Sequence, residues 1–298
     1  MALPAGSHGL ALVAVLWMTA ALGLLVAAIM ATTRADIAAS AGVRDTARAA
    51  ALGDAAIQLA VLEYRLDSAR EPGPFLGTYT FEGEEIEVRI VPGNSFIDIN
   101  TADHALLLAL FTHAGGLAEE EAERLAERVV QWRTPGTLQE LAGSERQQYI
   151  ASGAAFRPRH GNFESVADLM QVLGVDLDTY VRIERLISVH ESGHGVWPPT
   201  APDEVLAVIA AGNREAVDAY VRARETDPLG ADATRFDPHL VGGESTLVLH
   251  ARASVIIDGR HFERVRWIDV NRLGAMGEPW ATLQIEPVRI AGQGAQGR

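Results

Sequence analysis

The sequence predicts an α+β fold in which a long N-terminal helix precedes a small antiparallel sheet, with a large helical domain inserted between strands of that sheet. Three observations indicate it. Residues 34–70 keep apolar residues at helical spacing and lack proline. Alternating stretches typical of strands occur within 77–91 and again within 245–287. Helix-like segments separated by glycine, asparagine or proline lie between them.

Composition narrows the functional classes. The chain has 298 residues, 48% of them hydrophobic, which is enough for one large or two modest cores. A formal net charge of -14 disfavours nucleic acids and acidic surfaces as partners. The absence of cysteine excludes disulfides, zinc-cysteine sites and thiol catalysis.

The first 33 residues contain no Asp, Glu, Lys or Arg. Residues 10–33 would span roughly 36 Å as a helix, against a hydrocarbon layer of roughly 30 Å. We therefore expect a transmembrane helix over 10–33. A cleaved signal peptide is the alternative, but it normally has a basic start and an apolar run of about 7 to 15 residues. Because the leader has no Lys or Arg, charge alone does not set the topology.

The remaining elements follow in order. The helix is expected to continue over 34–70 and to end near Ser68, because Pro72 and Pro74 follow. Residues 71–100 are expected to form strands joined by a turn at 82–84. Residues 101–225 form the helical domain, with Thr101 and Thr200 as expected helix N-caps. Residues 226–298 are a loop followed by three strands.

Four stretches carry a resemblance to a known family: Gly9 to Trp17, Ile97 to Ala102, Val130 to Arg133, and Gly161 to Gly174. In these, and in the order of its elements over nearly the whole chain, the sequence resembles the K-type minor pseudopilins of type II (general) secretion systems. The resemblance implies a pilin-like fold whose inserted domain is of the helix-hairpin-helix or SAM-like kind.

The resemblance also implies how the chain matures. Residues 1–9 would be a prepilin leader that prepilin peptidase removes after Gly9, and Leu10 would become a methylated N-terminus. Residues 10–33 would then serve membrane insertion and filament packing. The packing positions expected within this segment are Leu12, Ala14, Leu16 and Trp17.

Most pilin-like subunits carry a glutamate where this chain has Ala14, and in the family its absence goes with a place at the pilus tip. The resemblance thus implies a structural subunit without catalysis, capping or initiating a pseudopilus for protein export across the outer membrane. Its partners would be I- and J-type minor pseudopilins, the inner-membrane assembly platform and prepilin peptidase. The chain would cross the inner membrane once, with its bulk in the periplasm.

No cofactor is expected. After Trp132 and Arg133 the acidic run common in the family is replaced by 134–136, which weakens the expectation of a calcium site there. Three loop carboxylates offer oxygen ligands for calcium, although a solvated acidic loop is the simpler and favoured explanation; they are Asp227, Asp232 and Asp237.

Two alternatives from other functional classes remain. His190, Glu191 and His194 match the spacing of a zinc peptidase motif, which requires a helix, whereas Gly193, Gly195 and two prolines indicate a loop. The helical domain also resembles membrane-tethered DNA receptors, whose glycine hairpins bind phosphate. Here the candidate hairpins are 114–117 and 173–176, and nearby carboxylates make them a poor phosphate surface.

Overall fold

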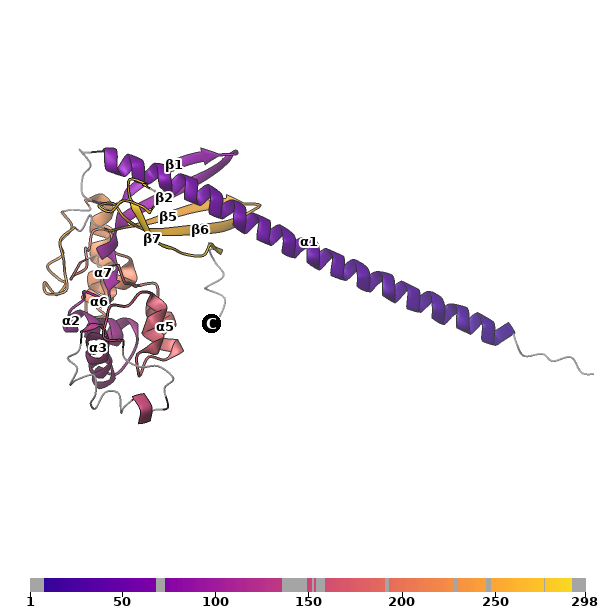
Figure 1. Ribbon diagram of the computed structural model, residues 1–298, viewed down its shortest axis with the longest axis horizontal. Coiled ribbons are helices and arrows are strands. Elements are labelled where there is room, and N and C mark those ends of the chain that lie inside the picture. The colour runs from indigo at the N-terminus through magenta and orange to yellow at the C-terminus, as the bar shows by residue number, and fades with distance from the viewer. Residues whose placement is uncertain are drawn as a thin grey trace, which may run out of the picture.

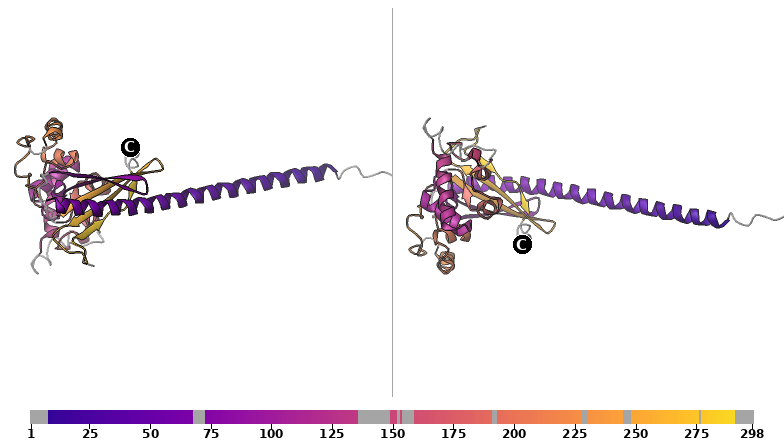
Figure 2. Two further views of the ribbon diagram at one scale, coloured as in Figure 1. Left: turned by 90° about the horizontal axis from the view of Figure 1, so that it is seen from above. Right: turned by 90° about the horizontal axis from the view of Figure 1, so that it is seen from below.

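A computed structural model describes residues 8–67, 73–135, 149–151, 153, 159–190, 193–227, 230–244, 248–275 and 277–290; the side chains of 8–12, 29 and 31–39 lie outside this description. Helix α1 (His8–Leu66) has 59 residues, a length of roughly 90 Å at the usual helical rise. Its C-terminal part lies along the sheet. Its N-terminal part projects away from the head, which is the sheet together with the helical elements (Figures 1 and 2). The helix ends within two residues of the expected position.

Within the described part of the chain, six strands form one antiparallel sheet of order β1-β2-β5-β6-β7, with β8 pairing β6. Both hairpin turns have two successive residues with positive φ, at Glu82–Gly83 and Asp258–Gly259, as tight hairpins prefer. The prediction of a mixed helix and antiparallel-sheet fold is confirmed. The strands are β1 (Phe75–Phe81), β2 (Glu84–Pro92), β5 (Val248–Ile257), β6 (Arg260–Asp269), β7 (Ala281–Ile285) and β8 (Arg289–Ile290).

One face of α1 packs on the sheet and forms the first hydrophobic core. The helix residues of this core recur at helical spacing, and the strand residues alternate along their strands. Both sets of side chains therefore face the layer between the helix and the sheet. Burying these side chains from water stabilises the packing of α1 on the sheet. The helix side contributes Leu52, Ala56, Ile57, Ala60 and Val61, and the sheet side contributes Ile86, Val88, Ile90, Leu249 and Phe262.

α1 approaches the sheet closely at Gly53. A Cβ atom there would lie 2.7 Å from Cβ of Arg264 on β6, so only glycine fits without displacement. The next residue, Asp54, accepts hydrogen bonds from Arg264 (2.7 and 3.0 Å) and Arg266 (2.8 Å). Burial raises the pKa of Asp54, but these two guanidinium groups outweigh it and hold the pKa below its usual value.

The helical elements lie between β2 and β5 in the chain and surround a second core. A short parallel pair, β3 with β4, joins the start of this block to the segment that follows α5. Trp132 is buried there and stacks on Phe163, with ring centroids 5.8 Å apart. The elements are η1 (Gly93–Ser95), β3 (Ile97–Asp98), α2 (His104–Ala109), η2 (Leu110–Ala114), α3 (Glu119–Arg133), η3 (Val166–Gln171), α5 (Leu177–Ile183), β4 (Ile187–Ser188), α6 (Asp203–Ile209) and α7 (Arg214–Thr226).

Several local expectations were wrong. The N-cap of α2 is Asp103, whose carboxylate accepts from Leu106 N, and α6 follows Pro202 without a side-chain cap. Thr101 and Thr200 instead bind neighbouring segments, at Gly193 O (2.5 Å) and Ser95 Oγ (2.5 Å). Within the segment 101–225, which was expected to be helical, Ile187 and Ser188 form strand β4, because pairing with β3 outweighs local propensity.

The contact at Gly53 gives a testable prediction. Gly53→Ala should lower the free energy of unfolding by about 1 to 3 kcal/mol, because the new methyl group displaces β6. Gly42→Ala, in the same helix but with nothing within 4 Å of its added Cβ, should be neutral or stabilise by about 1 kcal/mol. Denaturant unfolding of the full chain in detergent compares the two. Equal stability of both variants would contradict the close contact.

Candidate functional site

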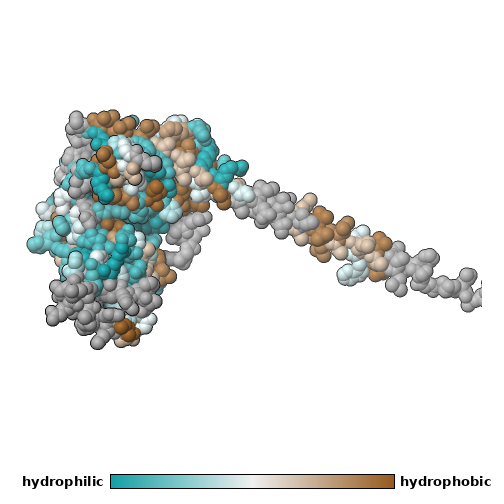
Figure 3. All heavy atoms as spheres, in the orientation of Figure 1, coloured by the Kyte–Doolittle hydropathy of each residue, from teal (hydrophilic) through white to brown (hydrophobic). Residues whose placement is uncertain are grey.

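The expected processing and packing positions lie in the projecting part of α1. Gly9, Leu10 and Leu12 are within the helix, but their side chains lie outside the described residues. Leu16 and Trp17 are 66% and 73% exposed, and Ala14 is exposed as well. Figure 3 shows hydrophobic residues along this projecting stretch, with no contact to the head.

Among the helices searched, which cover the described residues alone, none is both long enough and apolar enough to cross a bilayer. The membrane span expected over 10–33 therefore stays a prediction.

A second apolar stripe follows α1 where the helix lies on the sheet. Leu59, Leu62 and Leu66 are 42%, 43% and 73% exposed. Their spacing places them on one side of the helix, away from the buried Ile57 and Val61. Large exposed apolar side chains in a row are typical of a surface that another chain covers.

The candidate calcium ligands are each engaged in a local turn. Asp227 accepts from Gly230 N, Asp232 from Thr234 N and Asp237 from His239 N, each at 2.9 Å. Short backbone turns of this kind explain aspartate in loops without a metal. Within the described residues, no three His, Asp or Glu side chains gather as a possible metal site.

His190 and His194 of the zinc motif do not lie on a helix. His190 follows β4, and its Nε2 lies 3.0 Å from Oε1 of Gln284 on β7. His194 lies in a bend, with Nδ1 3.0 Å from the carbonyl oxygen of Thr101. Glu191 lies outside the described residues. The two imidazoles thus contact different segments, whereas the motif requires one helical face.

The two glycine turns considered for phosphate are held by this chain's own side chains. Arg182 donates to the carbonyl oxygen of Gly115 (2.9 Å), and Arg128 donates to that of Leu173 (2.7 Å). Asp176 caps α5 by accepting from Thr179 N (2.7 Å), which lowers its pKa. A carboxylate at the start of this helix opposes an approaching phosphate.

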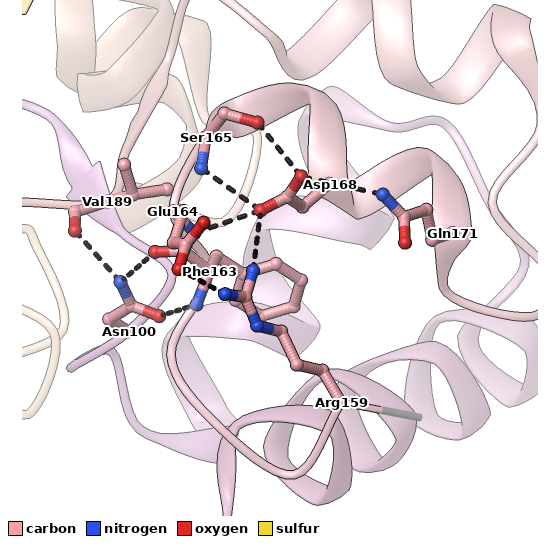
Figure 4. A network of polar contacts seen from close by, with 8 residues as sticks. All are labelled: Asn100, Arg159, Phe163, Glu164, Ser165, Asp168, Gln171 and Val189. Atoms are coloured by element: carbon pink, nitrogen blue, oxygen red, sulfur yellow. Dashed lines mark hydrogen bonds and ion pairs between the residues drawn. The ribbon is translucent and has the colours of Figure 1, made fainter. Parts of the chain in front are cut away.

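Asn100 joins three segments of the helical domain (Figure 4). Its side-chain amide donates to Val189 O (2.8 Å) and Phe163 O (3.0 Å), and its oxygen accepts from Phe163 N (2.8 Å). Arg133 holds the turn that follows β3, because its guanidinium donates to Ile99 O (2.7 Å) and to Ala102 O. Burial lowers the pKa of Arg133, and Asp98 and Asp103 partly offset it.

Three of the four stretches that carry the resemblance therefore meet at this junction. Residues 97–102, 130–133 and 161–174 are distant in sequence, and their polar groups bind one another's backbone. In the third stretch, Ser165 and Asp168 form a capping box at the start of η3, and Asp168 also pairs with Arg159 (Figure 4). The polar residues of these three stretches therefore serve to hold the helical domain together.

An aromatic cluster joins the helical domain to the sheet. His250 of β5 lies between Phe96 (4.6 Å) and Trp267 (4.7 Å), and Trp267 also contacts His190 (5.0 Å), all as ring-centroid distances. Burial, reinforced by the positive charge of Arg252, lowers the pKa of His250 to about 3. The ring is therefore neutral at neutral pH and packs as an aromatic side chain. Sequence analysis did not single out His250, because its position opposite Trp267 depends on the strand register.

The segment around Asn100 is similar in sequence to a known family. The family model described as "Type II secretion system (T2SS), protein K" matches residues 93–192, the segment that contains the junction around Asn100. The predicted resemblance to the K-type family is confirmed. The match covers 100 of the 298 residues of the chain. No curated protein matches the chain by sequence.

A solved structure shares the fold. One chain of "The Crystal Structure of the GspK-GspI-GspJ complex from enterotoxigenic Escherichia coli Type 2 Secretion System" superposes with a TM-score of 0.54. The superposition covers 82% of this chain and 95% of that chain, at 14% sequence identity. At this identity the match shows a common fold.

The buried His250 predicts a dependence of stability on pH. The unfolded chain takes up a proton near pH 6.5 and the folded chain only near 3, so stability falls as the pH drops through this window, by about 1 kcal/mol per pH unit. His250→Phe keeps the ring packing and should reduce this loss between pH 7.5 and pH 5. Denaturant unfolding at both pH values measures it; an unchanged loss in the variant would contradict the assignment.

Proposed function

We propose that this chain is a minor pseudopilin at the tip of the pseudopilus of a type II secretion system, where it caps or initiates assembly for protein export across the outer membrane. One observation carries the proposal: the pilin-like helix and sheet are combined with a protein K segment that adds a bulky helical domain at the head. Figure 1 displays this domain at the end of the molecule opposite the projecting start of α1. In the proposed filament, the bulky helical domain would block the addition of another subunit beyond this one.

The proposed assembly depends on α1. Prepilin peptidase would cut after Gly9 and methylate Leu10, and the apolar stretch over 10–33 would anchor the chain in the inner membrane with the head in the periplasm. Within the filament this stretch would pack against sibling helices. Small residues such as Ala14 allow close approach of two helices, and Leu12, Leu16 and Trp17 supply the apolar contacts.

The proposed partners are the I- and J-type minor pseudopilins, since the solved structure with this fold is of a GspK-GspI-GspJ complex. The inner-membrane assembly platform and prepilin peptidase would act on the chain before and during assembly. The stripe of Leu59, Leu62 and Leu66 provides an apolar surface for sibling helices above the membrane. The proposed role includes neither a catalytic step nor a required cofactor.

A co-purification experiment tests this function. The full chain, extracted in detergent after co-expression with the I- and J-type subunits of its own secretion system, should retain both. Leu59→Gln combined with Leu62→Gln should weaken retention roughly tenfold or more, because the two leucines, each less than half exposed, together lose about 1.3 to 2.5 kcal/mol of apolar burial.

Leu177→Gln is the control, because Leu177 is 62% exposed on α5, in the helical domain. This variant should retain both partners at the wild-type level. Failure of the wild-type chain to retain either subunit would count against the proposed function. Equal retention by the double variant would instead remove the α1 stripe from the interface.

A further inference from the structure

A groove rich in arginine lies between the sheet and the helical domain. Its volume is about 460 Å³, within the range of sites for organic ligands, about 300 to 1,000 Å³. Phe96 and the neutral His250 lie among its apolar lining. The charged residues that line it come from two strands and three helical segments: Arg89, Arg182, Arg185, Arg224, Arg252 and Glu204.

The positive charge of this groove is only partly compensated. Arg224 pairs with Asp203 at 2.5 Å, and Arg252 lies 3.9 Å from Glu263. Within the described part of the chain, the guanidinium groups of Arg89 and Arg185 have neither a hydrogen bond nor an ion pair. Five guanidinium groups thus line the groove with one carboxylate, in a chain whose formal net charge is -14.

The arginines of the groove repel one another, and this repulsion contributes to a lowered pKa of Arg89. Partial burial, followed by the positive charges of Arg224 and Arg252, lowers the pKa of this guanidinium group. The arrangement is unfavourable for the empty protein and becomes favourable when an anion enters. Arginine is suited to this role because its planar fork binds carboxylate oxygens in pairs.

The surroundings favour one kind of anion. A nucleic acid is disfavoured as the ligand, because the chain is acidic overall outside this groove and repels a polyanion. A lipid headgroup is also disfavoured if the proposed membrane segment holds, since residue 33 lies roughly 24 Å along α1 from Ala49, where the helix begins to pack on the sheet, well beyond a screening length of about 8 Å. Charge spread over several elements suits a ligand with more than one carboxylate.

We propose that this groove binds a short acidic peptide segment of a partner protein, whose carboxylates bridge Arg89, Arg185 and Arg252. Arginine clusters are a recurrent means of recognising acidic motifs. The site is separate from the α1 surfaces that serve the proposed filament role, so its occupancy is measured independently of assembly.

The test uses the full chain in a non-ionic detergent and a fluorescent hexaglutamate peptide, with hexaglutamine as the uncharged probe. Fluorescence anisotropy should show saturable binding of hexaglutamate alone, weakened by added salt. Arg89→Gln combined with Arg185→Gln should weaken binding at least tenfold. Arg214→Gln combined with Arg222→Gln removes the same charge from exposed sites on α7 outside the groove lining, and should change binding less than twofold.

Each result decides the proposal. Absence of hexaglutamate binding by the wild-type chain, or equal weakening by both double variants, would overturn it. So would displacement of the peptide by equimolar inorganic phosphate, or a higher affinity for phosphatidylglycerol vesicles. Arg185→Gln alone, at an exposed position, provides a single variant whose fold is checked by circular dichroism. Its expected effect is a loss of several-fold in affinity with an unchanged spectrum.

Discussion

The packing of α1 on the antiparallel sheet is the interaction on which the rest of the structure depends. It aligns the helix with the strands through one apolar layer, and Gly53 with Asp54 fixes the helix against β6. The sheet in turn carries both ends of the helical domain, because the chain leaves it after β2 and returns at β5. A shift of α1 would therefore displace the helical domain as well as the projecting stretch.

The helical domain is held to this frame by polar and aromatic contacts of different kinds. Asn100 and Arg133 bind backbone groups within the domain, while Phe96, His250 and Trp267 fill the space between the domain and the sheet. This junction holds the domain against the sheet. It also creates the arginine groove, whose residues come from both sides of the junction.

Much of the fold was predictable from the sequence, because periodicity reports local structure well. The long helix, the hairpin at Glu82–Gly83 and the strands after residue 245 follow from spacing and turn residues. The cap at Asp103, strand β4 and the place of His250 did not follow, since each depends on a partner distant in sequence. Arg89 and Arg252 occupy outward positions on their strands, but only the register places them side by side.

The central claim is that α1 begins as a processed pilin-type helix. The most direct test is the N-terminal mass of the membrane-extracted chain, expressed with and without a prepilin peptidase. The account predicts N-methylated Leu10 only when the peptidase is present. An intact Met1 under both conditions, or a cut near residues 31–33, would contradict it and would indicate a plain anchor or a secreted domain.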